Sequence, residues 1–424
     1  MQTLLRGGQV WNHGTWNTMD IMITDDKITD RGVGLSEAGC DRVLELNGLF
    51  VFPGFVDVHV HLREPGFSYK ETIATGSAAC ARGGYTTVCA MPNLNPAPDD
   101  DGHLRVQEEL IRENAVIRVL PYGTITEGQK GEGRVTDMAA LADRVCGFSD
   151  DGRGVKTAET MRLAMERCAA ADSIIAAHCE DVRVIPAGGC IHAGHYAAEH
   201  DLPGIPSSSE WEPIARDVEL AAQTGCRYHV CHVSCRESVD IIRRAQRCGV
   251  DITCETAPHY LLLTEDDLRD EGRFKMNPPL RSKDDQAALL EGVLDGTIGM
   301  IATDHAPHAA EEKAKGLRGS AMGIVGIETA FPLLYTYLVE TGKLPLEVLV
   351  DHLTVNPRKR FRLDGGMEVG DRAELTVFDL HTDETIDPDR FLSKGHATPF
   401  AGWQVHAACR LTMVGDRIAW NGLN

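Results

Sequence analysis

Short apolar runs alternate with longer amphipathic stretches from about residue 50 to residue 303. The runs are rich in β-branched residues and have the length of buried strands, whereas the stretches between them repeat apolar residues at helical spacing. This alternation predicts parallel βα units and an α/β fold of the closed (β/α)8 TIM-barrel class. The predicted strands are residues 55–59, 86–91, 117–123, 145–148, 174–178, 228–232, 252–255 and 299–303, and the predicted helices are residues 71–82, 104–113, 158–170, 213–224, 237–248 and 283–294.

The two ends of the chain do not show this alternation of strands and helices. They carry short alternating segments separated by Gly and Asp turns, with Gly415 placed to make a hairpin. We expect the two ends to form one small β domain beside the barrel. The predicted boundaries are residues 1–50 and 365–424 for the β domain and residues 51–364 for the catalytic barrel.

Composition narrows the class of protein. Hydrophobic residues make up 43% of the 424 residues and charged residues 25%, which is typical of a globular protein. A formal net charge of −21 argues against nucleic acid and anionic membranes as partners. The sequence shows neither a signal peptide nor a membrane-spanning run, so we expect a cytoplasmic protein, and the odd number of thirteen cysteines favours reduced thiols.

The candidate chemistry begins at the end of the first predicted barrel strand. His59 and His61 are two residues apart, so their side chains point to the same side and can share a metal ion. Taken singly, each such residue is also typical of a hydrogen-bonded strand end. Further imidazoles and carboxylates close the fourth, fifth, sixth and eighth strands, and six such groups at five strand ends argue against coincidence. These further groups are Asp151, His178, His232 and Asp304.

Strand ends of a TIM barrel meet at one mouth, so the six groups are expected to converge. Imidazole and carboxylate ligands suit zinc and similar ions. Six ligands exceed the three that one catalytic zinc uses, which favours two ions with Asp151 between them. Two ions can activate one shared water and polarise a carbonyl, which is the chemistry of amide hydrolysis.

Several segments resemble those of dihydroorotases, a family of the amidohydrolase superfamily. The resemblance extends over residues 50 to 360 and is closest to the bacterial type I enzymes, whose barrel carries a flanking β domain. It implies a TIM barrel of the metal-dependent hydrolase type. The segments are residues 57–66, Met91-Pro92-Asn93, residues 148–152, 177–180, 229–234, Asn277-Pro278-Pro279-Leu280-Arg281 and residues 304–308.

The resemblance implies specific roles for individual residues. It implies two zinc ions per subunit, bridged by Asp151 and by a water or hydroxide. It further implies that Asp304 is both a metal ligand and the catalytic proton shuttle. The first ion would be held by His59, His61 and Asp304, the second by His178 and His232, and the substrate by His61, Arg63, Asn93, Asn277, His308, Met322 and Gly323.

The implied reaction is the reversible cyclisation of N-carbamoyl-L-aspartate to (S)-dihydroorotate and water in de novo pyrimidine (UMP) biosynthesis. Both compounds are anionic, and the planar guanidinium of Arg63 suits a carboxylate better than lysine would. Residues 306–323 form a long charged loop that either covers the site or is merely exposed. The resemblance also implies a homodimer and an association with aspartate transcarbamoylase.

Two other functions are compatible with parts of this pattern. The first is a related cyclic-amide hydrolase acting on hydantoin, dihydropyrimidine or allantoin, and Arg63 and Asn93 argue against it because those rings carry no carboxylate. Many hydantoin-type enzymes also bridge their metals with a carboxylated lysine, where this chain has Asp150 and Asp151. The second is a catalytically silent scaffold, against which the retention of all six ligands argues.

Overall fold

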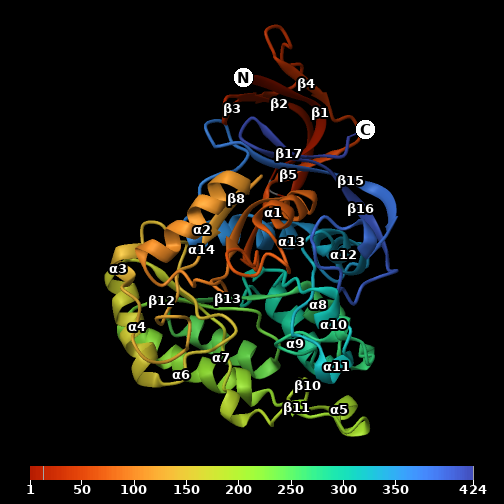
Figure 1. Ribbon diagram of the computed structural model, residues 1–424. Coiled ribbons are helices and arrows are strands. Elements are labelled where there is room, and N and C mark those ends of the chain that lie inside the picture. The colour runs from red at the N-terminus through yellow and green to blue at the C-terminus, as the bar shows by residue number, and fades with distance from the viewer. Residues whose placement is uncertain (13, 424) are drawn as a thin grey trace.

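The computed structural model describes residues 1–12 and 14–423, in which a β domain stands on one end of an α/β barrel (Figure 1). The barrel strands run parallel in two groups, β6-β7-β8 and β9-β12-β13-β14. Bridge pairs Gly123–Phe148, Phe148–Ile175 and Val60–His305 join the two groups into a ring, so the predicted eight-strand barrel is confirmed. The strands are β6 (Phe55–Val60), β7 (Tyr85–Ala90), β8 (Arg118–Pro121), β9 (Ile174–Ala177), β12 (Arg227–Val230), β13 (Ile252–Thr256) and β14 (Met300–Ile301).

The fourth and eighth predicted barrel strands are among those that are shorter than expected. The fourth is reduced to bridges around Phe148, whose N–H donates to Ile174 O at 2.9 Å. The eighth ends as a ladder at Ile301, because the Thr303 N–H is taken by the Asp57 carboxylate at 3.0 Å. The Asp57 side chain therefore takes the place of a neighbouring strand at Thr303, the residue directly before the candidate ligand Asp304.

The main helices lie between the strands, as the amphipathic pattern predicts. Thr72, Thr157 and Ser282 cap α1, α4 and α9 by accepting a hydrogen bond from the third helical N–H. Among the described residues the long helices are α1 (Ile73–Arg82), α2 (Asp101–Asn114), α4 (Ala158–Ala170), α6 (Ser208–Thr224), α7 (Arg236–Arg247) and α9 (Lys283–Leu294). The shorter ones are α3 (Met138–Leu141), α5 (His195–Glu199), α8 (Pro258–Leu262), α10 (Ala310–Lys313), α11 (Gly316–Gly319), α12 (Ala330–Leu334), α13 (Leu346–Leu353) and α14 (Val355–Phe361).

Helix α6 begins five residues earlier than the expected start at Pro213. The sequence favours Pro213 as a first-turn residue, because proline lacks the N–H that an interior position needs. In the structure Pro213 lies inside the helix. The carbonyl of Ser209, which Pro213 cannot bond, accepts the Asp181 N–H at 2.7 Å instead. A long-range hydrogen bond thus allows a helix that local sequence disfavours.

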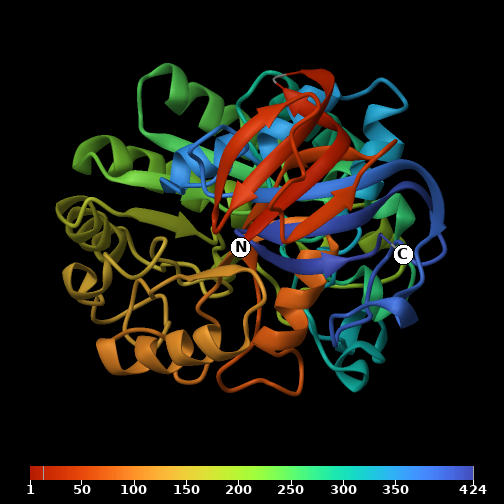
Figure 2. The ribbon, with the colours of Figure 1, turned by 90° about the horizontal axis from the view of Figure 1, so that it is seen from above.

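The two chain ends form one sheet in the order β17-β16-β15-β5-β1-β2-β3, with β4 also on β1. β5 pairs antiparallel with β15, with Val51 opposite Val377, and strands from both ends lie side by side above the barrel (Figure 2). This confirms a β domain built from both ends, while its boundaries at residues 50 and 365 stay a prediction. The strands are β1 (Gln2–Asn12), β2 (Thr15–Thr24), β3 (Lys27–Gly32), β4 (Arg42–Glu45), β5 (Phe50–Pro53), β15 (Glu374–Thr385), β16 (Gln404–Val414) and β17 (Arg417–Asn421). A separate pair, β10 (Ile191–His192) and β11 (Gly204–Ile205), lies in the connection after β9.

A cluster of aromatic rings joins the β domain to the barrel. Phe52 of β5 contacts Phe55 of β6 and Phe331 of α12, with ring centroids 6.0 and 5.4 Å apart. Phe378 of β15 stacks on Phe55 at 5.6 Å. These rings are at most 2% exposed, so the two parts share one hydrophobic core.

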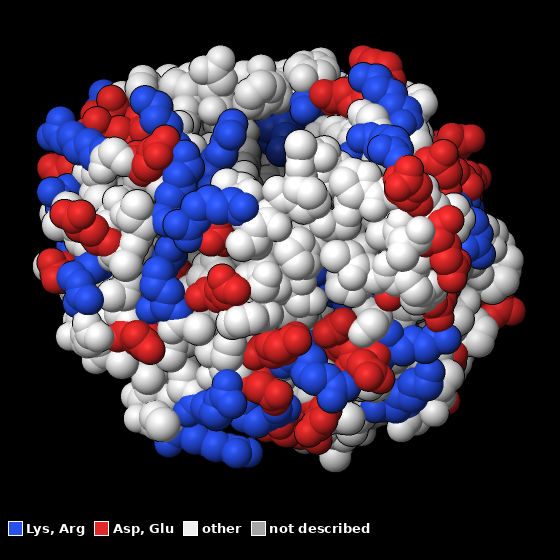
Figure 3. Space-filling model, turned by 90° about the horizontal axis from the view of Figure 1, so that it is seen from below, with Lys and Arg blue, Asp and Glu red and all other residues white. Residues whose placement is uncertain are grey.

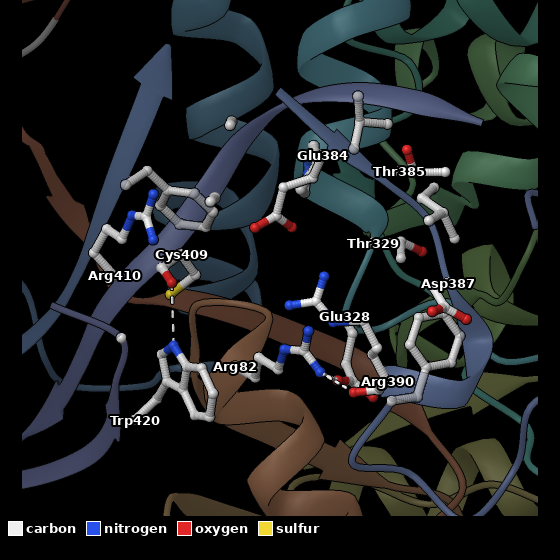
Figure 4. Close-up of a pocket in the computed structure, with 18 residues that line it drawn as sticks. Arg82, Glu328, Thr329, Glu384, Thr385, Asp387, Arg390, Cys409, Arg410 and Trp420 are labelled. Carbon is white, nitrogen blue, oxygen red and sulfur yellow. Dashed lines mark hydrogen bonds and ion pairs between the residues drawn. The ribbon is translucent and has the colours of Figure 1, made fainter. Parts of the chain in front are cut away.

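Arg82 at the end of α1 fastens the C-terminal strands to the barrel at the edge of a cavity of about 260 Å³ (Figure 4). Its guanidinium lies 3.1 Å from the Glu328 carboxylate and 5.7 Å above the ring of Trp420. Trp420 in turn donates to the Cys409 carbonyl at 3.1 Å. Arg82 therefore contacts both Glu328 and strand β17.

The face of the barrel opposite the β domain carries lysine, arginine, aspartate and glutamate side chains interspersed around a hollow (Figure 3). The negative net charge is therefore not gathered into one patch on this face. Among the described residues, no helix combines the length and the apolar character needed to cross a membrane.

Candidate active site

Four imidazoles surround the carboxylate of Asp151 at the C-terminal end of the barrel. Asp151 Oδ1 lies 3.4 Å from both His59 Nε2 and His178 Nδ1. The same oxygen is 3.5 Å from His232 Nε2, and Asp151 Oδ2 is 3.6 Å from His61 Nε2. All five residues are at most 6% exposed. Folding therefore brings four predicted strand ends to one carboxylate.

Asp304 completes the cluster beside the two histidines of the first strand. Its Oδ1 lies 3.1 Å from His61 Nε2 and 3.5 Å from His59 Nε2. The ligand atoms form two groups of three, each within 4.8 Å, and Asp151 belongs to both. The groups are His59, His61 and Asp151, and Asp151, His178 and His232.

The buried atoms of this cluster fit a metal ion. His59 Nε2 and Asp151 Oδ1 are inaccessible to solvent and have no hydrogen-bond partner. A buried carboxylate oxygen without a donor is costly, and a divalent cation removes that cost while accepting the imidazole lone pairs. The donor set of nitrogen and carboxylate oxygen therefore marks a metal site, which the candidate residues of the sequence assemble.

Glu255 orients the first histidine from behind. Its carboxylate accepts hydrogen bonds from His59 Nδ1 and from His229 Nε2, both at 2.9 Å. Burial opposes ionisation of Glu255, but these bonds and the imidazole charges lower its pKa to about 2. When His59 is neutral and donates through Nδ1 to Glu255, its Nε2 lone pair faces Asp151.

Three candidate residues have left-handed backbone. Arg63 has φ 60°, His232 φ 37° and Asp304 φ 47°. This region is unfavourable for residues other than glycine, and such strain persists only where surrounding contacts enforce it. The strained positions all lie at strand ends of the same cavity, which is typical of a functional site.

A cavity of about 400 Å³ opens beside the cluster. Arg63 reaches into it with Nη2 3.4 Å from His308 Nε2, while its Nε donates to the Pro307 carbonyl at 3.2 Å. Lys70 Nζ lies 3.3 Å from His308 Nδ1, and burial together with Arg63 and Lys70 lowers the pKa of His308 to about 3. Two cations around a neutral imidazole suit an anionic ligand. The sequence-predicted residues that line the cavity are His61, Arg63, Asn93, Asp151, His178, His232, Asn277, Asp304, His308, Met322 and Gly323.

The two predicted amide residues face the cavity from different loops. Asn93 donates through Nδ2 to the Asp151 carbonyl at 2.7 Å, and its Oδ1 is buried without a partner. Asn277 donates through Nδ2 to Glu180 at 2.8 Å, and Glu180 lies 3.4 Å from His178 Nε2. Both amides are thus held by residues that adjoin the metal cluster.

Comparison with known proteins decides the family. A family model described as "Dihydro-orotase-like" matches residues 48–238. The dihydroorotase of Anoxybacillus flavithermus is 50% identical over 404 residues, covering 95% of this chain and 94% of that protein. The dihydroorotase of a Geobacillus species is 49% identical over 424 residues, covering 99% of each. The chain belongs to the dihydroorotase family.

Solved structures of the same superfamily support the fold of this dihydroorotase family member. The L-hydantoinase (dihydropyrimidinase) from Arthrobacter aurescens superimposes with a TM-score of 0.88 at 27% identity, covering 99% of this chain and 96% of that one. The shared architecture is a TIM barrel with a β domain from both termini. Family and buried cluster together identify the chain as a metal-dependent hydrolase.

Of the two aspartates after the fourth strand, only Asp151 faces the metal cluster. Asp150 accepts the backbone N–H groups of Ile125 and Thr126 at 2.8 and 3.1 Å. Lys156, the nearest lysine along the chain, pairs with Glu132 at 2.8 Å. The lysine of hydantoin-type enzymes thus has no counterpart at this position of the chain.

His305 and Cys235 lie outside the metal cluster, although each follows a cluster residue closely in the sequence. His305 Nε2 is 3.9 Å from Glu71, on the other side of its strand from Asp304. Cys235 donates to Glu210 at 3.4 Å, whereas Cys231 adjoins His59, so the two thiols do not form a pair.

Sequence analysis did not name two residues that contact candidate site residues, Glu255 and Lys70. Glu255 ends the seventh predicted strand, which places it at the same mouth as the ligands. Lys70 follows Arg63 in the loop after the first strand, and a second cation there was the available signal for a carboxylate pocket.

Proposed function

We propose that this dihydroorotase family member interconverts N-carbamoyl-L-aspartate and (S)-dihydroorotate at the cluster around Asp151. The observation that carries the proposal is the arrangement of one cavity, which the residues of the metal cluster and the guanidinium of Arg63 line together. Such a cavity suits an amide that carries a carboxylate on the same small molecule.

The proposed metal content is two zinc ions. His59, His61 and Asp304 would hold one, His178 and His232 the other, and Asp151 both. When bound, the metals supply Lewis acidity, which lowers the pKa of a water and polarises the amide carbonyl. The two groups of ligand atoms that share Asp151 support this division.

Asp304 is the proposed proton shuttle. Burial opposes its ionisation, but the hydrogen bond from His61 and the charges of His59, His61 and His232 lower its pKa well below the usual range. Asp304 is therefore ionised, and its carboxylate is the proposed proton acceptor in the hydrolytic direction. It accepts a proton from the attacking water and delivers it to the ring nitrogen that leaves, and ring closure runs the same transfer in reverse.

The remaining candidates would bind and orient the substrate. Arg63, Asn93 and His308 are proposed to bind the carboxylate, whereas Asn277 and the Met322–Gly323 backbone are proposed to face the ring amide. His61, a member of the metal cluster, also lines this cavity and is proposed to contact the substrate. Their positions around the cavity support these roles.

A substrate panel combined with elemental analysis tests the proposal. Purified protein is assayed with dihydroorotate, hydantoin, dihydrouracil and allantoin, and its bound metal is counted. We expect hydrolysis of dihydroorotate alone, with two zinc-like ions per chain. Metal-loaded protein that hydrolyses only the neutral rings would contradict the proposed substrate, and inertness towards all four compounds would favour a catalytically silent scaffold.

The proposal also includes a cytoplasmic location, a homodimer and an association with aspartate transcarbamoylase.

A further inference from the structure

Lys313, at the end of α10, is a buried lysine whose donors all serve main-chain carbonyls. The residue is 8% exposed. Its Nζ donates to Lys275 O at 3.0 Å, to Ala321 O at 2.7 Å and to Gly323 O at 2.7 Å. Three acceptors use all three protons of an ammonium group.

The three carbonyls belong to two different loops that reach the cavity. Ala321 and Gly323 flank Met322 in the loop after strand eight, and Lys275 lies two residues before Asn277 in the loop after strand seven. Met322, Gly323 and Asn277 all line the cavity. The Gly323 N–H also donates to Lys275 O at 3.1 Å, so the two loops are cross-linked at the lysine.

A lysine that merely filled space would be an expensive choice at this position. A buried ammonium is costly unless each proton is hydrogen-bonded, and methionine has a similar volume without that cost. Ion pairing does not account for the lysine either, because its adjacent carboxylate, Glu312, pairs with Lys70 at 3.0 Å. The ammonium is therefore best explained by the carbonyls that it holds.

We propose that Lys313 is a positioning residue, whose ammonium joins the loops after strands seven and eight and thereby places the Met322–Gly323 backbone and Asn277 against the substrate. The inference rests on the proposed function, because those residues are proposed to face the ring amide. It adds a residue that does not line the cavity itself.

The charge of Lys313 makes this anchor sensitive to pH. Burial, followed by the charge of Lys275, lowers the pKa of Lys313 to about 7, and Glu312 opposes the shift. Lys275, the other cation at this junction, donates to Arg318 O at 3.0 Å; burial lowers the pKa of Lys275, and the Cys190 thiol opposes that shift. Above neutral pH the amine keeps two donors for three carbonyls, so the loops are held less firmly.

The test compares Lys313→Met with Lys315→Met, an exposed lysine two residues further on. In Lys313→Met we expect KM for dihydroorotate to rise about tenfold, the effect of losing about one net hydrogen bond, with kcat reduced less and metal content unchanged. Wild-type KM should rise between pH 6 and 8.5, and this rise should be missing in the variant. Lys315→Met should match the wild type in each respect.

Amide hydrogen exchange provides a readout that does not depend on turnover. At one pH, peptides covering residues 321–326 should exchange faster in Lys313→Met than in Lys315→Met, because Gly323 N–H loses its fixed partner. An unchanged KM with unchanged exchange would overturn the inference. If Lys313→Met does not fold, Lys313→Gln provides the same comparison, since its shorter amide side chain carries no charge.

The experiments distinguish a failure of the proposed function from a failure of the proposed role of Lys313. A metal-loaded wild-type protein that does not hydrolyse dihydroorotate contradicts the proposed function, whatever the loops do. An active wild type whose KM, pH profile and exchange are all reproduced by Lys313→Met contradicts only the role of Lys313.

Discussion

His59 is held between two carboxylates, and its Nδ1 donates to Glu255 at 2.9 Å on the side away from Asp151. This contact selects the tautomer whose Nε2 lone pair points into the metal cluster. It also links His59 to His229, which shares the same carboxylate. Glu255, which does not face the metal cluster itself, therefore helps to orient a proposed metal ligand for binding.

Substituting Glu255 by glutamine should weaken metal binding by about 10-fold to 100-fold, the usual effect of losing a partner that orients a ligand. The amide accepts one hydrogen bond at its oxygen, so His59 or His229 loses its acceptor. Metal retained after dialysis against graded chelator measures the effect. Glu237→Gln, on the exposed first turn of α7, is the matched control, and equal retention in the two variants would contradict the role of Glu255.

Asp304→Asn should abolish most turnover while leaving much of the metal bound. The amide cannot accept and return a proton, and general acid–base catalysis typically contributes about 10²-fold to 10⁴-fold. Five other ligands remain. Single-turnover rates and metal content are measured together, with His232→Ala as the comparison that should lose metal. Normal turnover by Asp304→Asn would disprove the shuttle.

Arg63→Met should raise KM for dihydroorotate by about 10-fold to 100-fold, since a hydrogen bond between charged groups contributes roughly 1.5–3 kcal/mol. Arg63→Lys should lie between the wild type and Arg63→Met, because an ammonium keeps the charge but not the planar pair of donors. Steady-state kinetics on the three proteins provide the comparison. Exposed Arg153, in the loop after the fourth strand, supplies the control Arg153→Met. Identical KM values for wild type and Arg63→Met would place the carboxylate elsewhere.

Gly323→Ala should impair substrate binding without unfolding the protein. Gly323 has φ +131°, and an added Cβ would lie 2.8 Å from Ala306 Cβ and 3.0 Å from His308 Nε2. The strain is on the order of 1–3 kcal/mol, which the loop can relieve only by moving away from the cavity. Gly326→Ala in the same segment meets no atom within 4 Å and is the control. Kinetics and thermal melting together distinguish local displacement from global loss.

Arg82→Met should lower the free energy of unfolding by about 1–3 kcal/mol, because the Glu328 side chain, 4% exposed, would lose its charged partner. Packing on Trp420 would be lost with it. Thermal melting of Arg82→Met beside Arg105→Met, a variant of an exposed pair on α2, measures the difference. Catalytic constants should stay unchanged, since this junction lies apart from the residues that line the active-site cavity.

The sequence by itself determined the barrel, the β domain and the identity of the groups that converge. Apolar periodicity reports burial, and the C-terminal ends of parallel strands must meet at one mouth, so His59, Asp151, His178 and Asp304 could be brought together without coordinates. The family resemblance supplied the proposed role of each residue as metal ligand, bridging ligand or proton shuttle.

Only the tertiary structure decided which neighbours support these groups. Glu255 and Lys70 contact residues far along the chain, and their positions in the sequence place them near the mouth of the barrel without showing which residues they contact. The early start of α6 and the short eighth strand have the same cause. In each case a long-range hydrogen bond, from Asp181 to Ser209 or from Thr303 to Asp57, overrides what the local sequence favours. A hydrogen bond between residues far apart in the sequence forms only when the folded chain brings them close together, so the local sequence alone does not reveal it.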